Sequence, residues 1–283
     1  MATPSAARGE RLDQFVSGQI PAISRASAAR LIEGGKVHIN GEIVLKAGYK
    51  LRENDQVQID YQHQETVELP QLELPVLYED KACVVINKPT GVLTHSKGAF
   101  NPEATVATWL SSRVEGMSGE RAGIVHRLDR ATSGVMICAK TPDALAWLQK
   151  QFSQRKVKKT YRAIVKGEVA PARAIIDMPI ERNPKKPQTF RVGVNGKAAV
   201  TEYKVIKTDD TLSELELKPT TGRTHQLRVH LQHLGHPIVG DILYGGQPAE
   251  RLYLHAHRLE LTLPNKTRQT FEAPVPTVFE ELL

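Results

Sequence analysis

The sequence predicts an α+β protein in which a small N-terminal module precedes a larger domain. From residue 76 to the C-terminus, strand-like and helix-like segments alternate without the regular strand–helix period of a doubly wound fold. Residues 9–60 follow a separate pattern of two helices and a hairpin, and residues 61–75 have the polar, proline-containing composition of a linker. A chain of 283 residues has room for this division into domain 9–60, linker 61–75 and domain 76–283.

Helix and turn signals define the elements of the N-terminal module. Ser24 can cap a helix that Gly34 and Gly35 end, and Asn40-Gly41 between alternating apolar residues favours a hairpin. The expected elements are helices at 12–16 and 25–33 and strands at 37–39, 42–44 and 57–59.

The larger domain is expected to mix short strands with helices. Thr141 can cap a helix that has Pro142 in its first turn, where a missing backbone N–H costs nothing. Strands are expected at 82–86, 135–139, 161–165, 199–206, 213–218 and 252–261, and helices at 103–110, 142–152, 223–233 and from 278 to the end.

The composition is that of a globular protein with a basic surface. A formal net charge of +7 and a pI near 9.3 favour a polyanionic partner, because Lys and Arg displace counterions from phosphates. No segment has the ~18 apolar residues of a membrane span, and the N-terminus is too short and polar for a secretory signal. Cys83 and Cys138 lie in apolar runs, where we expect buried, reduced thiols. We therefore expect a cytoplasmic protein without a membrane partner, acting as a monomer.

Asp129 is the acid with the most informative surroundings. Arg127 and Arg130 flank it closely, and His126 is nearby, in a turn-like segment before an apolar run that starts at Val135. A carboxylate among cations should stay ionised and oriented. Asp129 is therefore the first candidate for a catalytic group.

Five segments of the larger domain resemble, in the same order, the motifs of the RluA-type pseudouridine synthases. Residues 126–140 (HRLDRATSGVMICAK) match the motif H-R-L-D-x-x-T-S-G-x-x-x-x-A-K, in which this Asp is the essential residue. The other matches are NKPTG at 87–91, KKTYRAIVKG at 158–167, TGRTHQLRVH at 221–230 with its continuation to 241, and the closing segment 254–274. The N-terminal module resembles an S4 domain, a small RNA-binding module.

The resemblance implies a fold and a reaction. The fold is a catalytic domain with a mixed, mainly antiparallel sheet, preceded by a small S4 domain of the αL-like type. The reaction breaks the C1′–N1 bond of a uridine in RNA, rotates the base and joins C1′ to C5. Because no electrons enter or leave, no cofactor is required. Asp129 could attack C1′ or remove a proton from C2′, and the sequence leaves both routes open.

The resemblance also assigns roles to Arg223 and Tyr161. Arg223 is the expected planar, bidentate partner that keeps Asp129 ionised, with Arg228 as the less favoured substitute. Tyr161 offers an aromatic face on which the detached base can stack and a hydroxyl for proton transfer. The alternative for Tyr161 is an ordinary strand aromatic packed in the core.

Several basic side chains are expected to contact RNA. Arg127 matches the family position whose side chain reaches into the RNA when the target base leaves its stack. The alternative role for Arg127 is that of a surface arginine that contacts a phosphate. The other candidates, which could equally be solvated surface charges, are Arg25, Arg30, Lys36, Arg130, Lys158 and Lys159.

A zinc site is the main alternative use of the histidines. His255 and His257 would point to one side of a strand, and His225, His230 and His233 lie on a helix-like segment. Carboxylates or thiolates at ligand spacing are missing from these segments, so we expect no metal.

The S4 domain favours large-subunit (23S) ribosomal RNA as the substrate. A tRNA pseudouridine synthase of the same family is the first alternative, since substrate choice depends on loops and shape. The second is a non-catalytic RNA-binding or ribosome assembly protein on an idle synthase fold. The third, a hydrolase with Asp129 as nucleophile, lacks a second carboxylate in these motifs to activate water.

Overall fold

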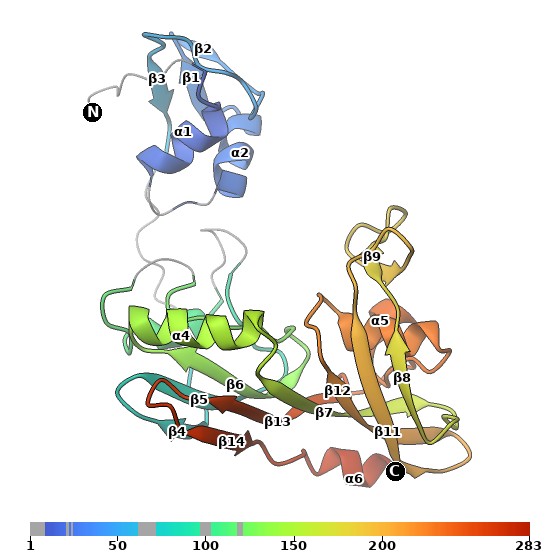
Figure 1. The fold of residues 1–283 in the computed structure, drawn as a ribbon. Helices are drawn as coiled ribbons and strands as arrows, with labels where there is room; N and C mark the ends of the chain where they lie inside the picture. Colours follow the sequence, from blue (N-terminus) through green and yellow to red (C-terminus); the bar gives the residue numbers. More distant parts are fainter. Residues whose placement is uncertain (1–8, 21–22, 24, 62–71, 97–102, 118–120) are drawn as a thin grey trace. The chain divides into compact units, whose positions relative to one another are not determined.

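The computed structural model describes residues 9–20, 23, 25–61, 72–96, 103–117 and 121–283. The chain divides into two compact units, residues 1–71 with 95–104 and residues 72–94 with 105–283 (Figure 1). The expected cap at Ser24 lies outside the described residues.

The first unit has the predicted helices and hairpin. Helices α1 (Leu12–Gln19) and α2 (Arg25–Glu33) pack on one apolar core with the sheet β2-β1-β3, whose strands are Glu42–Ile43, Val37–Ile39 and Val57–Ile59. Asn40 and Gly41 both have positive φ, 53° and 86°, which is the backbone that a two-residue turn between antiparallel strands requires. The core of this unit includes Leu12, Phe15 and Ile32.

The second unit is built on a nine-stranded sheet of order β4-β5-β6-β13-β7-β12-β11-β8, with β14 paired to β13. The β6–β13 pair is parallel, and the other pairs of this sheet are antiparallel, so the expected mixed, mainly antiparallel sheet is confirmed. The strands are β4 (Val76–Glu79), β5 (Cys83–Lys88), β6 (Ser133–Ala139), β7 (Lys158–Lys166), β8 (Arg173–Asp177), β11 (Val200–Thr208), β12 (Leu212–Pro219), β13 (Leu254–Thr262) and β14 (Arg268–Glu272).

Helices and a small hairpin complete the second unit. Helix α4 (Pro142–Ser153) lies over the sheet beside β6 (Figure 1). Its predicted cap is present, since the Thr141 hydroxyl accepts from the Ala144 N–H at 3.3 Å. The other elements are α3 (Val106–Leu110), the hairpin β9 (Ile180–Arg182) and β10 (Phe190–Val192), α5 (Gln226–His233), the 3₁₀ turn η1 (Ile242–Tyr244) and α6 (Val278–Leu282).

Two helices are shorter than the sequence predicts. Helix α3 begins at Val106, because the Thr105 hydroxyl accepts from the Thr108 N–H and the Thr108 hydroxyl accepts from the Thr105 N–H. Helix α5 begins at Gln226, because His225 before it has left-handed φ and ψ of 56° and 20°. Residues 223–225, expected to be helical, therefore form a loop beside the site.

Both cysteines are buried on neighbouring strands, and their thiols are free. Burial raises the pKa of each to about 12, so both stay protonated. Within the ranges described above, no helix is long and apolar enough to cross a membrane.

Candidate active site

A cavity of the second unit brings together three segments that are far apart in the sequence. Residues 127–129 precede β6, Lys159 and Tyr161 belong to β7, and residues 221–228 comprise the loop before α5 and the first residues of that helix. Strand β13 joins the first two, because Ala256 is paired with Gly134 of β6 on one side and with Tyr161 of β7 on the other. Strand β12, which leads to the third segment, pairs with the other edge of β7.

The loop that carries Asp129 is held by side chains from the segment after β5. Thr94 donates to the Leu128 carbonyl at 2.8 Å, and the Leu128 N–H donates to the same hydroxyl at 3.3 Å. The Lys88 ammonium is fully buried and donates to three carbonyls, those of Pro89, Val92 and Arg130, and burial lowers its pKa to about 7. These contacts fix the backbone on both sides of Asp129.

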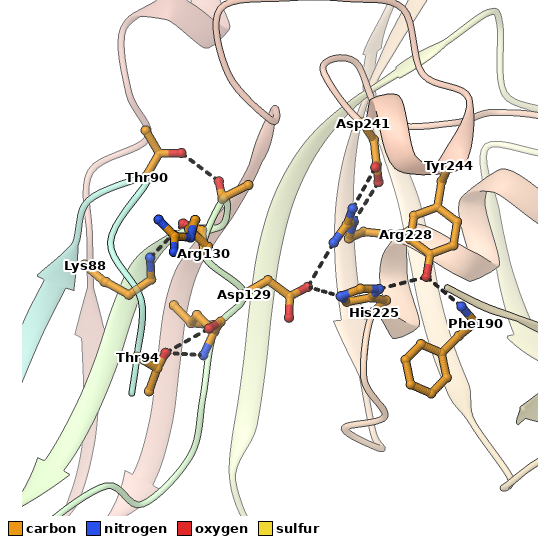
Figure 2. A network of polar contacts seen from close by, with 12 residues as sticks. Lys88, Thr90, Thr94, Asp129, Arg130, Phe190, His225, Arg228, Asp241 and Tyr244 are labelled. Atoms are coloured by element: carbon orange, nitrogen blue, oxygen red, sulfur yellow. Dashed lines mark hydrogen bonds and ion pairs between the residues drawn. The ribbon is translucent and has the colours of Figure 1, made fainter. Parts of the chain in front are cut away.

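One carboxylate oxygen of Asp129 faces two nitrogen groups. Arg228 Nη1 lies 3.4 Å from Oδ2, and His225 Nε2 lies 3.8 Å from the same oxygen. Figure 2 shows Oδ1 turned away from both, and Oδ1 has no hydrogen bond or ion pair with the described residues. Arg228 is itself held by a bidentate pair with the buried Asp241, at 2.7 and 2.8 Å.

The prediction that Arg223 pairs with Asp129 is wrong, because Arg228 occupies that place. The Arg223 guanidinium lines the cavity and donates through Nε to the Ala198 carbonyl at 3.0 Å. Arg223 lies on the loop before α5, whereas Arg228 lies on the buried face of the helix. The planar, bidentate contact expected at Asp129 is made instead to Asp241.

Tyr161 is partly buried on β7, and its side chain lines the cavity with Asp129. Burial, with a smaller contribution from the Asp129 charge, raises the pKa of Tyr161 well above its usual value. The hydroxyl therefore stays protonated at neutral pH, where it can donate a hydrogen bond but is a weak acid.

His126 does not add to the positive charge around Asp129, contrary to the sequence-based expectation. Its Nε2 accepts from the Ile137 N–H at 3.1 Å, and its ring stacks on Phe152 with centroids 4.6 Å apart. Burial lowers the pKa of His126 to about 3, so it is neutral at pH 7.

The predicted RNA-contacting residues have different surroundings. Arg127 and Arg130 are exposed, and Arg127 lines the cavity. Lys159 donates to the Thr221 carbonyl at 2.9 Å, and burial lowers its pKa to about 8, whereas Lys158 pairs with Glu260 at 3.2 Å. In the first unit, Arg25 pairs with Asp13, Lys36 pairs with Asp60, and Arg30 is exposed.

Several of the histidines considered as zinc ligands make hydrogen bonds within the protein. Among the described residues, no three His, Cys, Asp or Glu side chains are grouped to hold a metal ion. His230 contacts the Thr201 hydroxyl and the Met178 carbonyl, and His255 contacts Ser133 and, at 3.4 Å, the Ala273 carbonyl. These rings are partners of ordinary hydrogen bonds in the core.

Comparison with known proteins identifies the family and the fold. The family described as RNA pseudouridylate synthase matches residues 82–233, more than half of the chain, and the S4 domain matches residues 10–57. The chain belongs to the RNA pseudouridylate synthase family. The RluA-type resemblance of its motifs and the S4 resemblance of its first unit are thereby confirmed, and the chain is an RNA pseudouridine synthase, an isomerase.

Relatives extend the similarity of this synthase over nearly its whole length. It is 39% identical over 244 residues to an uncharacterized RNA pseudouridine synthase of Aquifex aeolicus, covering 83% of this chain and 77% of the relative. It is 35% identical over 295 residues to the ribosomal large subunit pseudouridine synthase D of Escherichia coli K12, covering 97% of this chain and 90% of the relative. The solved structure of human RNA pseudouridylate synthase domain containing 1 has a TM-score of 0.60 and 30% identity, covering 75% of this chain and 86% of that one.

Sequence reasoning missed most of the groups around Asp129. His225 was considered only as a zinc ligand, and Asp241 and Tyr244 were given no role. Both His225 and Asp241 lie within the motif at 221–241, which marks them as candidates without saying what they contact. Tyr244 lies outside that motif and carries no such signal.

Proposed function

We propose that this synthase converts uridine to pseudouridine in large-subunit ribosomal RNA, with Asp129 as the group that acts on the ribose. The observation that carries the proposal is the Asp129 carboxylate itself, which has Oδ2 beside Arg228 and His225 and, among the residues that the structure describes, no partner for Oδ1 in the cavity shared with Tyr161. An oriented carboxylate next to an aromatic platform is what the isomerisation needs.

Two routes satisfy the chemistry with these groups. In the first, Oδ1 attacks C1′ and the C1′–N1 electron pair leaves with the base; after rotation C5 attacks C1′ and displaces the carboxylate. In the second, Oδ1 removes the C2′ proton as the base leaves and returns that proton after C5 has joined C1′. In both routes the proton on C5 is lost to solvent and N1 gains one.

The remaining residues are assigned roles by position. Arg228 holds Oδ2 of Asp129 in place, Tyr161 stacks against the detached base, and Arg127, which is exposed and lines the cavity, takes the place of the extracted base. Arg223 contacts substrate in the cavity it lines instead of pairing with Asp129. Lys159, which lines the same cavity, is suited to a phosphate of the target strand.

Ribosomal RNA is favoured over tRNA by the relatives. The Escherichia coli relative named for the large ribosomal subunit aligns with 97% of this chain, which includes the S4 domain.

We propose an S4 domain at 9–60, a linker at 61–75 and a catalytic domain at 76–283. We also propose that the enzyme works as a monomer, since one chain supplies every group around Asp129, and that it works in the cytoplasm, where ribosomal RNA is found.

Release of tritium from uridine C5 tests the proposal. Wild-type protein incubated with large-subunit ribosomal RNA carrying tritium at uridine C5 should release label to water, and Asp129→Asn should release none while binding RNA with unchanged affinity. Label released from tRNA but not from ribosomal RNA would replace the substrate assignment. Wild-type protein that binds both RNAs without releasing label would instead indicate an RNA-binding protein on an idle scaffold.

A further inference from the structure

His225 joins Asp129 to Tyr244. The residue directly precedes α5 with a left-handed φ of 56°. Its Nε2 lies 3.8 Å from Asp129 Oδ2, and its Nδ1 lies 2.8 Å from the Tyr244 hydroxyl (Figure 2). The two ring nitrogens therefore face different groups, a carboxylate and a phenol.

The Tyr244 hydroxyl determines which nitrogen carries the proton. Burial lowers the pKa of His225 and raises that of Tyr244, so both are neutral at pH 7. The Tyr244 oxygen already accepts from the Phe190 N–H at 3.0 Å, which leaves its own proton to donate. With the histidine proton on Nδ1, that phenol proton would lack an acceptor among the described residues, and a bare Nε2 would face the Asp129 carboxylate. With the proton on Nε2, both groups are satisfied.

Neighbouring rings hold the imidazole in this orientation. Tyr244 and Phe190 both meet the His225 ring edge to face, with centroids 5.6 Å apart and interplanar angles of 88° and 77°. The Arg228 guanidinium lies 4.9 Å from the centre of the Tyr244 ring. Tyr244 therefore supports both groups that face Oδ2.

We propose that His225, held by Tyr244 as the tautomer with its proton on Nε2, is a positioning residue for Asp129. Together with Arg228 it restrains Oδ2, fixes the rotation of the carboxylate and leaves Oδ1 for the ribose. A separation of 3.8 Å is longer than a hydrogen bond, and we expect the contact to shorten when RNA fills the cavity. This role rests on the proposed function, because it serves the reaction of Asp129.

Two substitutions separate the parts of this arrangement. His225→Asn suits the left-handed backbone, keeps an acceptor for Tyr244 and removes the Nε2–H. Tyr244→Phe keeps the ring and removes the hydroxyl. In the tritium-release assay we expect kcat to fall by about 10- to 100-fold for His225→Asn and by less for Tyr244→Phe, with KM unchanged within about 2-fold, because misplacing a reacting group costs turnover and not binding.

Matched controls lie away from Asp129. His233→Asn makes the same change at an exposed position of α5, and Tyr203→Phe removes a hydroxyl that donates to the Pro171 carbonyl at 3.1 Å. Neither should change kcat or KM.

Nitrogen-15 NMR of the full-length protein with labelled histidine measures the tautomer without turnover. In the wild type, the His225 signals should show a bare Nδ1 and a protonated Nε2, and Tyr244→Phe should give a mixture of tautomers. A protonated Nδ1 in the wild type, or a kcat for His225→Asn within 2-fold of wild type, would overturn the proposal. Absence of turnover in the wild type would contradict the proposed function instead. The tautomer of His225 is measured in the wild-type protein, so this test stands even if a variant fails to fold.

Discussion

At the scale of single residues, the position of Arg228 is set before any substrate binds. Asp241 is 2% exposed and holds the guanidinium through two hydrogen bonds, so the arginine that faces Asp129 cannot swing away. Among the described residues, the Arg223 guanidinium has only the Ala198 carbonyl as its hydrogen-bond partner. This difference explains why the arginine of the helix, not the one of the preceding loop, pairs with Asp129.

Arg228→Gln should destabilise the fold as well as slow the reaction. Removing the guanidinium leaves the Asp241 carboxylate buried without a counter-charge, which typically costs about 3–5 kcal/mol. We expect urea unfolding to show a loss of this size. Arg223→Gln is the matched control and should change the free energy of unfolding by less than about 0.5 kcal/mol, because the hydrogen bond of its guanidinium is exposed to solvent and its removal leaves no buried charge. Equal losses for the two variants would contradict the assignment.

Buried neutral histidines should make the protein sensitive to acid. Burial lowers the pKa of His126 to about 3 and that of His255 to about 4, against 6.5 for histidine in an unfolded chain. Between these values the unfolded state binds protons that the folded state does not, so stability is complete above about pH 6.5 and falls as pH decreases. Each such histidine contributes up to about 1.4 kcal/mol per pH unit.

Urea unfolding between pH 7.5 and 5 measures this slope. His126→Gln should make the slope shallower, because one titrating group is removed, whereas His233→Gln at an exposed position should leave it unchanged. An identical slope for wild type and His126→Gln would show that His126 is protonated in the folded protein.

At the scale of elements, the site depends on how closely β6 approaches β13. Gly134 has a φ of +118°, and a Cβ atom there would lie 2.2 Å from the Ala256 carbonyl oxygen. Only glycine allows this approach, and the approach carries the Asp129 loop to the cavity that Tyr161 lines. The backbone of the sheet thus sets the distance between the two groups.

Gly134→Ala should therefore damage both stability and turnover. The alanine must push β6 away from β13, and we expect a loss of more than about 3 kcal/mol together with a large fall in kcat. Gly235→Ala is the control, because that glycine also has a positive φ, +86°, but no atom lies within 4 Å of the added Cβ. It should lose only about 1–2 kcal/mol in urea unfolding, from backbone strain alone. Similar losses in both would show that strain, and not the close approach, explains Gly134.

At the scale of the whole molecule, the cavity with Asp129 and the S4 domain belong to different units. The cavity and every group around Asp129 lie in the second unit, whereas Arg30 and Lys36 belong to the S4 domain of the first. Such a division lets one unit raise the local concentration of RNA for the other. Changes in the S4 domain should therefore alter affinity without altering the chemical step.

Arg30→Gln combined with Lys36→Gln tests this separation. We expect a higher KM, an unchanged kcat, and a slope of log Kd against log salt that is shallower by about 1–2, because fewer counterions are released. The control, Arg173→Gln with Lys204→Gln, removes two exposed charges from β8 and β11 of the second unit and should leave the slope unchanged. Equal effects of the two pairs would indicate a general dependence on net charge.

The sequence by itself determined the reaction class, the S4 domain, the mixed sheet, most helices and the family motif that contains Asp129, because these depend on local patterns and contiguous motifs. It did not reveal β4, β8, β9, β10 and β14, whose short runs carry little periodicity. The start of α5 was also placed too early, because the left-handed backbone of His225 has no signal in the residue type.

Only the tertiary structure decided which groups surround the carboxylate. Asp129 and Arg228 are separated by 99 residues, and their contact depends on sheet pairing and on a helix anchored through Asp241. The sequence shows that the 221–230 motif has two arginines, Arg223 and Arg228, but it does not show in which direction each side chain points. That direction follows from where α5 begins and which of its faces is buried, which is a property of packing and not of local sequence.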